Sequence, residues 1–256
     1  VQALKINGKI FKIWIQIASF SNKKSANILK KKFDSIKKIN IKDTPFSSGL
    51  VRDYIESEKL NSFFSYKNQL DNYKNIIKKR SSFPLKKRDL LYNVLNSQYN
   101  GISDIGSVLD SIEKLKNKNT FTVTTGHQLC LNTGPLYFIY KILHTIKLCV
   151  ELSKTYKEFN FIPVFWMASE DHDFEEIKSF ETYSNKYQIA SSDDGSCTGK
   201  IKPLYVTKIL EEINKNFDGK PFKNDIYNLF ASSYSKNLSL AESTRKIVHT
   251  LFKDYG

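Results

Sequence analysis

Two β-rich segments on either side of one long helical pattern restrict the folds open to this chain of 256 residues. Residues 120–125 are rich in β-branched and aromatic side chains, and residues 161–168 form a continuous apolar run typical of a strand buried on both faces. Between them, residues 135–156 carry apolar side chains at helical spacing, opened by Gly134-Pro135. This order predicts a βαβ unit, with parallel strands and a right-handed crossover. We expect Gly126 to end the first strand.

Helical spacing also dominates the chain before the first of these strands. Residues 44–116 are predicted to form three helices, separated by Pro84 and by Asn100-Gly101. The second helix carries apolar side chains at helical spacing, which we expect to face the core: Leu90, Leu91, Val94 and Leu95.

After the second strand, the pattern predicts two short strands around Asp193-Asp194-Gly195 and then three helices. In chain order these five elements cover residues 186–190, 201–206, 207–217, 225–234 and 239–255. The last helix opens with Ser239-Leu240-Ala241-Glu242, a capping box in which the serine and the glutamate satisfy each other's main-chain donors. The fold class is therefore predicted to be α/β.

Positive charge is concentrated at the start of the chain. Residues 1–42 hold eleven lysines against one acid, whereas residues 43–256 hold 29 basic and 25 acidic residues. Only four of the 40 basic residues are arginine, the side chain that reads phosphates and bases bidentately. We therefore expect no nucleic-acid partner, and we treat residues 1–42 as a basic extension that need not belong to the fold.

Composition also excludes several other classes of protein. No uninterrupted apolar run approaches the roughly 20 residues that a membrane-spanning helix needs, so no membrane partner is expected. The three cysteines form no C-x-x-C pair, which excludes a zinc ribbon and argues against a disulfide scaffold. No secretory leader is recognisable either, so we predict a cytoplasmic location.

Two polar clusters follow the two predicted strands, at the strand ends where open α/β sheets bind their ligands. The first, Thr125-Gly126-His127-Gln128, offers main-chain N–H groups, an imidazole and an amide ahead of a helix N-terminus. The second, Ser169-Glu170-Asp171-His172-Asp173, sets four ionisable side chains in succession. A tight turn would also explain the first cluster, and capping of the next helix by Asp173 with Glu176 would explain the second. We favour polar substrate binding over both.

Other chemistries at these clusters remain open. His127, Asp171 and His172 could bind a metal, although no H-x-x-x-H spacing is present and no metal is predicted. Cys130 lies close to His127 in the chain, but neighbouring loop positions are not expected to align a nucleophile with its base. His144 lies in a predicted helix and, like His249, is expected at the surface.

Three strings carry a family resemblance, in this order along the chain. They are VTTGHQL at 123–129, TGPLYFIYK at 133–141 and PVFWMASEDHDFEEI at 163–177. Together they resemble the bacillithiol biosynthesis cysteine-adding enzyme family. The resemblance runs from about Asp43 to Gly256, departs from the family at Cys130, and is loose over 195–200.

The resemblance implies a ligase that joins cysteine to glucosaminyl-malate in the last step of bacillithiol biosynthesis. It also implies a Rossmann-like core related to class I synthetases and nucleotidyltransferases. A helical coiled-coil domain, associated with homodimerisation, would lie further along the family's chain. We therefore divide this chain into the basic extension, a helical region at 43–118 and an incomplete Rossmann-like core at 119–256. No methionine opens the chain, which suggests a fragment or a processed product. Because the βαβ pattern asks for a further strand and the family's coiled-coil domain would lie beyond Gly256, we expect the N-terminal part of a longer enzyme that does not act alone.

The predicted site has His127 and Gln128 as catalytic residues. Its predicted substrate-binding residues are Thr125, Gly126, Trp166, Glu170, Asp171, His172 and Asp173. ATP is the simplest activator of the cysteine carboxylate, but there is no G-x-x-x-x-G-K-[ST] phosphate loop, so the cofactor stays unassigned. Two alternatives remain: a metal-dependent hydrolase or nucleotidyltransferase using His127, Asp171, His172 and Asp173, and a binding module without catalysis.

Overall fold

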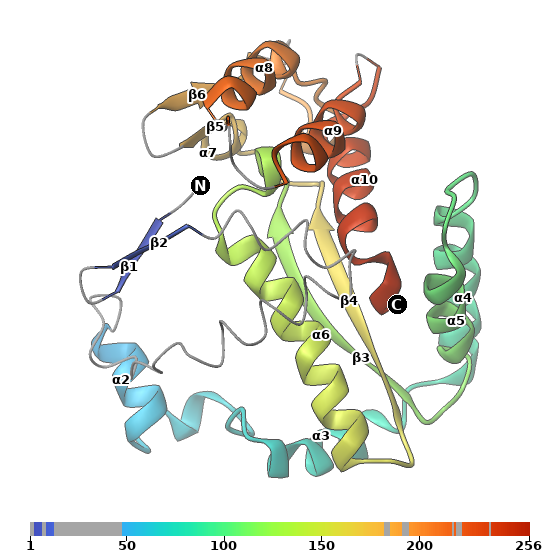
Figure 1. The fold of residues 1–256 in the computed structure, drawn as a ribbon. Helices are drawn as coiled ribbons and strands as arrows, with labels where there is room; N and C mark the ends of the chain where they lie inside the picture. The colour runs from blue at the N-terminus through green and yellow to red at the C-terminus, as the bar shows by residue number, and fades with distance from the viewer. Residues whose placement is uncertain are drawn as a thin grey trace.

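Two parallel strands joined by one long helix form the centre of the fold (Figure 1). Strand β3 (Thr120–Gln128) pairs with β4 (Asn160–Ala168) along its whole length, and α6 (Tyr137–Thr155) connects them. The predicted βαβ unit and its parallel sheet are therefore confirmed. The computed structural model describes residues 48–256 and the backbone of residues 3–6 and 9–12, with gaps at 182–184, 191–194, 217, 219–221 and 236.

Strand β3 extends three residues beyond the predicted end at Thr125, so the expectation that Gly126 ends the strand is wrong. Gly126 lies opposite Trp166, and a Cβ at this position would stand 3.3 Å from the Trp166 carbonyl oxygen. Glycine tolerates this close approach, so pairing continues to Gln128. His127 and Gln128 are consequently strand residues that face opposite sides of the sheet.

One face of the sheet packs against α6. Phe138, Ile139 and Ile142 are buried on this helix, and the Phe138 ring meets Phe165 of β4 edge to face at a centroid distance of 5.2 Å. The apolar face predicted from helical spacing is thus confirmed in part: Ile139 is buried, whereas Val150, also expected to face inward, is 48% exposed. Residues of α10 (Leu240–Phe252) join the same cluster through side chains such as Val248.

A second apolar cluster lies beyond the carboxyl end of β3. It joins the loop after β3 to the helices α8 (Val206–Asn216), α9 (Lys223–Ser233) and α10. Figure 1 shows α8 and α9 at this end of the strands. These helices begin and end within a few residues of their predicted bounds. The capping box of α10 is present, since the Ser239 N–H donates to Glu242 Oε2 at 2.8 Å and the Glu242 N–H donates to Ser239 Oγ at 3.3 Å.

The strand predicted at 201–206 is wrong. Leu204 makes only an isolated bridge with Ala190, and Tyr205 has a φ of 64°, a left-handed conformation that breaks an extended run. The strand predicted at 186–190 is shorter, as β6 (Lys186–Gln188). It pairs antiparallel with β5 (Ser179–Glu181), which follows the short helix α7 (Phe174–Ile177) and was not predicted. The turn expected at Asp193-Asp194 lies outside the described residues.

The region before β3 is helical, as predicted, with 3₁₀ turns η4 (Asn61–Phe63) and η5 (Leu70–Asn72). Its α-helices are α2 (Gly49–Glu56), α3 (Tyr73–Arg80), α4 (Leu85–Gln98) and α5 (Gly106–Lys114). Three helices were predicted here, so α2 is one more than expected. The expectation that the apolar stripe of α4 faces the core is wrong. Leu90 is 63% exposed and Val94 is 44% exposed, whereas the buried residue of this helix is Arg88.

At the start of the chain, β1 (Ala3–Ile6) and β2 (Lys9–Lys12) form an antiparallel pair within the predicted basic extension. No strand was predicted there. Among the helices that the structure describes, none is both long and apolar enough to cross a membrane.

Candidate functional site

The carboxyl ends of β3 and β4 bring the two predicted polar clusters together. Gln128 is the last residue of β3, and its side-chain Nε2 donates to Asp171 Oδ2 and to Glu176 Oε2, each at 2.8 Å. One amide group therefore bridges two carboxylates that lie 43 and 48 residues further along the chain. Glu176 was considered only as a capping residue in the sequence, although its position within the PVFWMASEDHDFEEI string was a signal for it.

Asp171 is held as an ionised acceptor. Its Oδ1 accepts the Asp173 N–H at 3.0 Å, and its Oδ2 accepts the Gln128 amide. These two hydrogen bonds, the main-chain one first, lower the pKa of Asp171 below its ordinary value. At neutral pH this carboxylate is available to a cationic group of a ligand.

Asp173 caps α7, since its Oδ1 accepts the Glu176 N–H at 3.0 Å. The capping explanation therefore holds for this residue. Asp173 also remains exposed to solvent, as do Glu170 and His172, so the three side chains border the same loop surface. Their predicted roles in substrate binding stay predictions.

The loop that carries the acids is anchored through its main chain by the 3₁₀ turn η7 (Thr198–Lys200). The Gly199 N–H donates to the Ser169 carbonyl at 3.0 Å, and the Thr198 N–H donates to the Asp171 carbonyl at 2.7 Å. A Cβ on Gly199 would stand 2.5 Å from the Ser169 oxygen, so only glycine fits without a shift. This support comes from the segment whose family resemblance was loose, and sequence reasoning missed it.

His127 faces α6, on the other side of the sheet from Gln128. Its ring lies 5.2 Å from the Tyr137 ring and 5.3 Å from the Phe138 ring, centroid to centroid. Its Nδ1 lies 3.0 Å from the Gln128 carbonyl oxygen, so this hydrogen bond assigns the proton to Nδ1 and leaves the lone pair on Nε2. Burial, together with the nearby Lys141 charge, lowers the pKa of His127, which favours the neutral imidazole at pH 7.

Cys130 lies next to His127, with Sγ 3.5 Å from Nδ1. The two side chains are therefore close together, although neighbouring loop positions were not expected to align a nucleophile with its base. The loop is tight because Gly134 has a φ of 49°, and a Cβ there would stand 2.3 Å from the Cys130 Cβ. Burial raises the pKa of the Cys130 thiol to about 11, and Nδ1 already donates to a carbonyl, so the pair does not generate a thiolate nucleophile.

The other predicted residues take distinct positions around the strand ends. Trp166 is 60% exposed beside Gly126, and the glycine leaves its indole uncovered. Thr125 is half-buried one residue before Gly126. Trp166 therefore offers an apolar surface near the polar groups of the site.

The residues proposed for a hydrolase do not assemble as a metal centre. Within the described part of the chain, no group of three or more His, Cys, Asp or Glu side chains is arranged to hold a metal ion. Since His127 faces α6 and Asp171 is bonded to Gln128, the two belong to different hydrogen-bonding groups.

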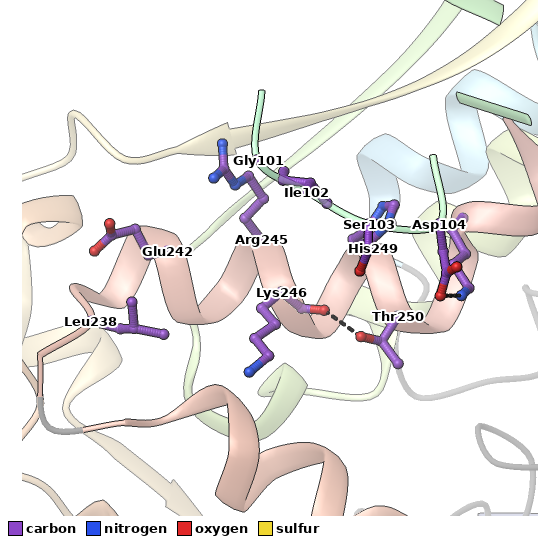
Figure 2. A pocket seen from close by; sticks show the side chains of 11 residues that line it. Gly101, Ile102, Ser103, Asp104, Leu238, Glu242, Arg245, Lys246, His249 and Thr250 are labelled. Carbon is purple, nitrogen blue, oxygen red and sulfur yellow. Dashed lines mark hydrogen bonds and ion pairs between the residues drawn. The ribbon is translucent and has the colours of Figure 1, made fainter. Parts of the chain in front are cut away.

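A separate cavity of about 380 Å³ lies between α10 and residues 101–104 (Figure 2). Two of its cationic side chains donate to main-chain carbonyls: Arg245 Nη1 to the Gln98 oxygen at 2.9 Å and Lys246 Nζ to the Ser232 oxygen at 2.6 Å. A third, Lys253, pairs with Asp104 at 2.8 Å. The two carbonyls belong to the last turns of α4 and α9. The first two side chains, both of α10, therefore connect that helix to the C-terminal ends of α4 and α9. None of the predicted site residues lines this cavity.

Comparisons with known proteins agree on one family. The family model described as "Bacillithiol biosynthesis BshC, N-terminal Rossmann-like domain" matches residues 35–256, so the match begins eight residues before Asp43. The chain is 37% identical over 220 residues to "Putative cysteine ligase BshC" of Flavobacterium johnsoniae, which covers 85% of this chain and 41% of that protein. It is 37% identical over 223 residues to the protein of the same name from Cytophaga hutchinsonii, covering 87% and 40%. The chain thus spans about two fifths of the length of these curated relatives.

Proposed function

Because the chain belongs to the bacillithiol biosynthesis BshC family, we propose that the site at the ends of β3 and β4 serves a ligase that joins cysteine to glucosaminyl-malate. The Rossmann-like fold and the cysteine ligase names of the relatives support this reaction class. The identity of the acceptor, glucosaminyl-malate, is what the family resemblance in the sequence implies.

The observation that carries the proposal is the Gln128 bridge to Asp171 and Glu176, next to a neutral His127. Amide formation needs a free amine to attack the carboxyl carbon of cysteine. The new C–N bond forms as the C–O bond to the leaving group breaks, and the amine gives up a proton. In this proposal His127 Nε2 accepts that proton. The Asp171 and Glu176 carboxylates, on the Gln128 side of the strand end, bind a polar or cationic group elsewhere on a substrate.

A free carboxylate does not form an amide in water unless it is first activated. We propose that ATP supplies the leaving group, although the sequence has no phosphate loop of the Walker type. Support for an anion near the site comes from the Lys141 ammonium group on the His127 side. An assay from which ATP is omitted tests this part of the proposal directly.

The experiment is a product assay on the whole protein with cysteine, glucosaminyl-malate and ATP, in which the product thiol is measured by mass spectrometry. We expect a product with the mass of the amide, and no product when any one of the three substrates is omitted. Product formed without cysteine, or hydrolysis of glucosaminyl-malate that requires added zinc or manganese, would contradict the ligase and favour the metal-dependent hydrolase.

A further inference from the structure

Lys141 reaches the end of β3 from the second turn of α6. Its Nζ donates a hydrogen bond to the Gly126 carbonyl, on the residue directly before His127. The side chain is half-buried, and no carboxylate lies within ion-pair distance of it in the parts of the chain that the structure describes. Its ammonium group is therefore held at the strand end by the Gly126 carbonyl and not by an ion pair.

The groups that face His127 come from two elements. Helix α6 contributes Lys141 and Tyr137, and the loop after β3 contributes the Cys130 thiol, which stays protonated. Lys141 is therefore the charged group that acts on the imidazole from the packed side. Its positive charge disfavours a second positive charge on His127 and, after burial, is a cause of the lowered His127 pKa.

We propose that Lys141 is a positioning residue of the ligase site: its ammonium group fixes the Gly126 carbonyl and thereby sets the place and the neutral state of the His127 imidazole. The inference rests on the proposed function, because it gives His127 the role of proton acceptor. A hydrogen-bond donor alone would satisfy the Gly126 carbonyl. The charge adds a second effect, since it keeps the Nε2 lone pair free at the pH where the amine is to be deprotonated.

The test separates the hydrogen bond from the charge. Lys141→Gln keeps an N–H donor without the charge, Lys141→Met removes both, and Lys141→Arg keeps both. Lys147→Met is the matched control, because Lys147 is an exposed lysine of the same helix that pairs with Glu151. In each whole protein, the His127 titration is followed by NMR of labelled histidine, and kcat/KM is measured against pH.

We expect the His127 midpoint to move to higher pH in Lys141→Gln and Lys141→Met, because removing a neighbouring positive charge stabilises the imidazolium ion. The acidic limb of the kcat/KM profile should move in the same direction, and kcat/KM at pH 7 should fall at least about tenfold in Lys141→Met. Lys141→Arg and Lys147→Met should leave both curves in place.

An unchanged His127 midpoint in Lys141→Gln would overturn the inference, as would a shifted midpoint with an unchanged kcat/KM profile. The NMR titration does not depend on catalysis. If the wild-type protein forms no amide product, the proposed function fails, while the titration still decides whether Lys141 controls His127. Should Lys141→Met fail to fold, Lys141→Gln and Lys141→Arg carry the same comparison.

Discussion

Neighbouring residues at the end of β3 make different contacts, because successive side chains of a strand point to opposite faces of the sheet. Gln128 bridges Asp171 and Glu176, whereas His127 packs beneath α6 against Phe138. The G-H-Q string indicated which residue types are present, but it could not show that His127 and Gln128 face opposite sides of the sheet. This arrangement followed once the strand proved to extend to Gln128, which depends on pairing with β4 and not on local sequence.

Gln128→Glu is expected to disrupt the acidic half of the site. The change places a third carboxylate beside Asp171 and Glu176 and removes the amide donors that now hold them. We expect product formation at pH 7 to fall at least about tenfold, with partial recovery as the pH is lowered, because protonating one carboxyl relieves the repulsion. Gln128→Ala should lose activity without this recovery. Identical pH profiles of the two variants would contradict the bridge.

His127 gives the folding stability a pH dependence of known sign. Its pKa is lowered in the folded protein, so protonation favours the unfolded chain. The stabilisation is complete above the ordinary histidine pKa of about 6.5 and is lost as the pH falls through and below that value. In His127→Asn, the decrease in Tm between pH 7.5 and 5.5 should therefore be smaller than in the wild type. An equal decrease in both proteins would show that His127 is not held neutral.

At the scale of elements, short sequence signals predicted where the helices begin and end. They did not predict which residues of different elements contact one another. The capping box placed the start of α10, and Pro84 separated α3 from α4, because both signals act within one turn. The burial of Arg88 could not be predicted, since its partners are carbonyls at the end of α5 and the start of β3. The left-handed Tyr205 likewise has no local signal in its sequence.

Arg88→Met is expected to destabilise the fold strongly. Nη1 of Arg88 donates to the Leu115 oxygen at 3.0 Å and to the Thr120 oxygen at 2.9 Å, so the change leaves two carbonyls at a buried site without these donors. The expected loss in the free energy of unfolding is about 2–4 kcal/mol, measured by urea unfolding. The control is Arg80→Met, an exposed arginine of α3, with an expected change within about 0.5 kcal/mol. Equal losses in both variants would show that the buried hydrogen bonds do not stabilise this junction.

At the scale of the molecule, topology made the site predictable in outline. Parallel strands end at the same edge of a sheet, so two polar clusters placed at the ends of two such strands had to come close. Lys141, Glu176 and Gly199 complete the site from a helix, a short helix and a turn. Their roles depend on tertiary packing that spacing along the chain does not encode. The homodimer, the cytoplasmic location and the division of the chain at residues 43 and 119 stay predictions.

The central claim is that chemistry occurs at the ends of β3 and β4. The most direct measurement compares product thiol formed by His127→Ala and by His144→Ala in the whole protein, with cysteine, glucosaminyl-malate and ATP. His144 is the matched control because it is an exposed histidine of α6, as predicted. We predict at least about a tenfold loss of turnover for His127→Ala at unchanged folded content, and wild-type turnover for His144→Ala. Wild-type turnover in His127→Ala would contradict the account.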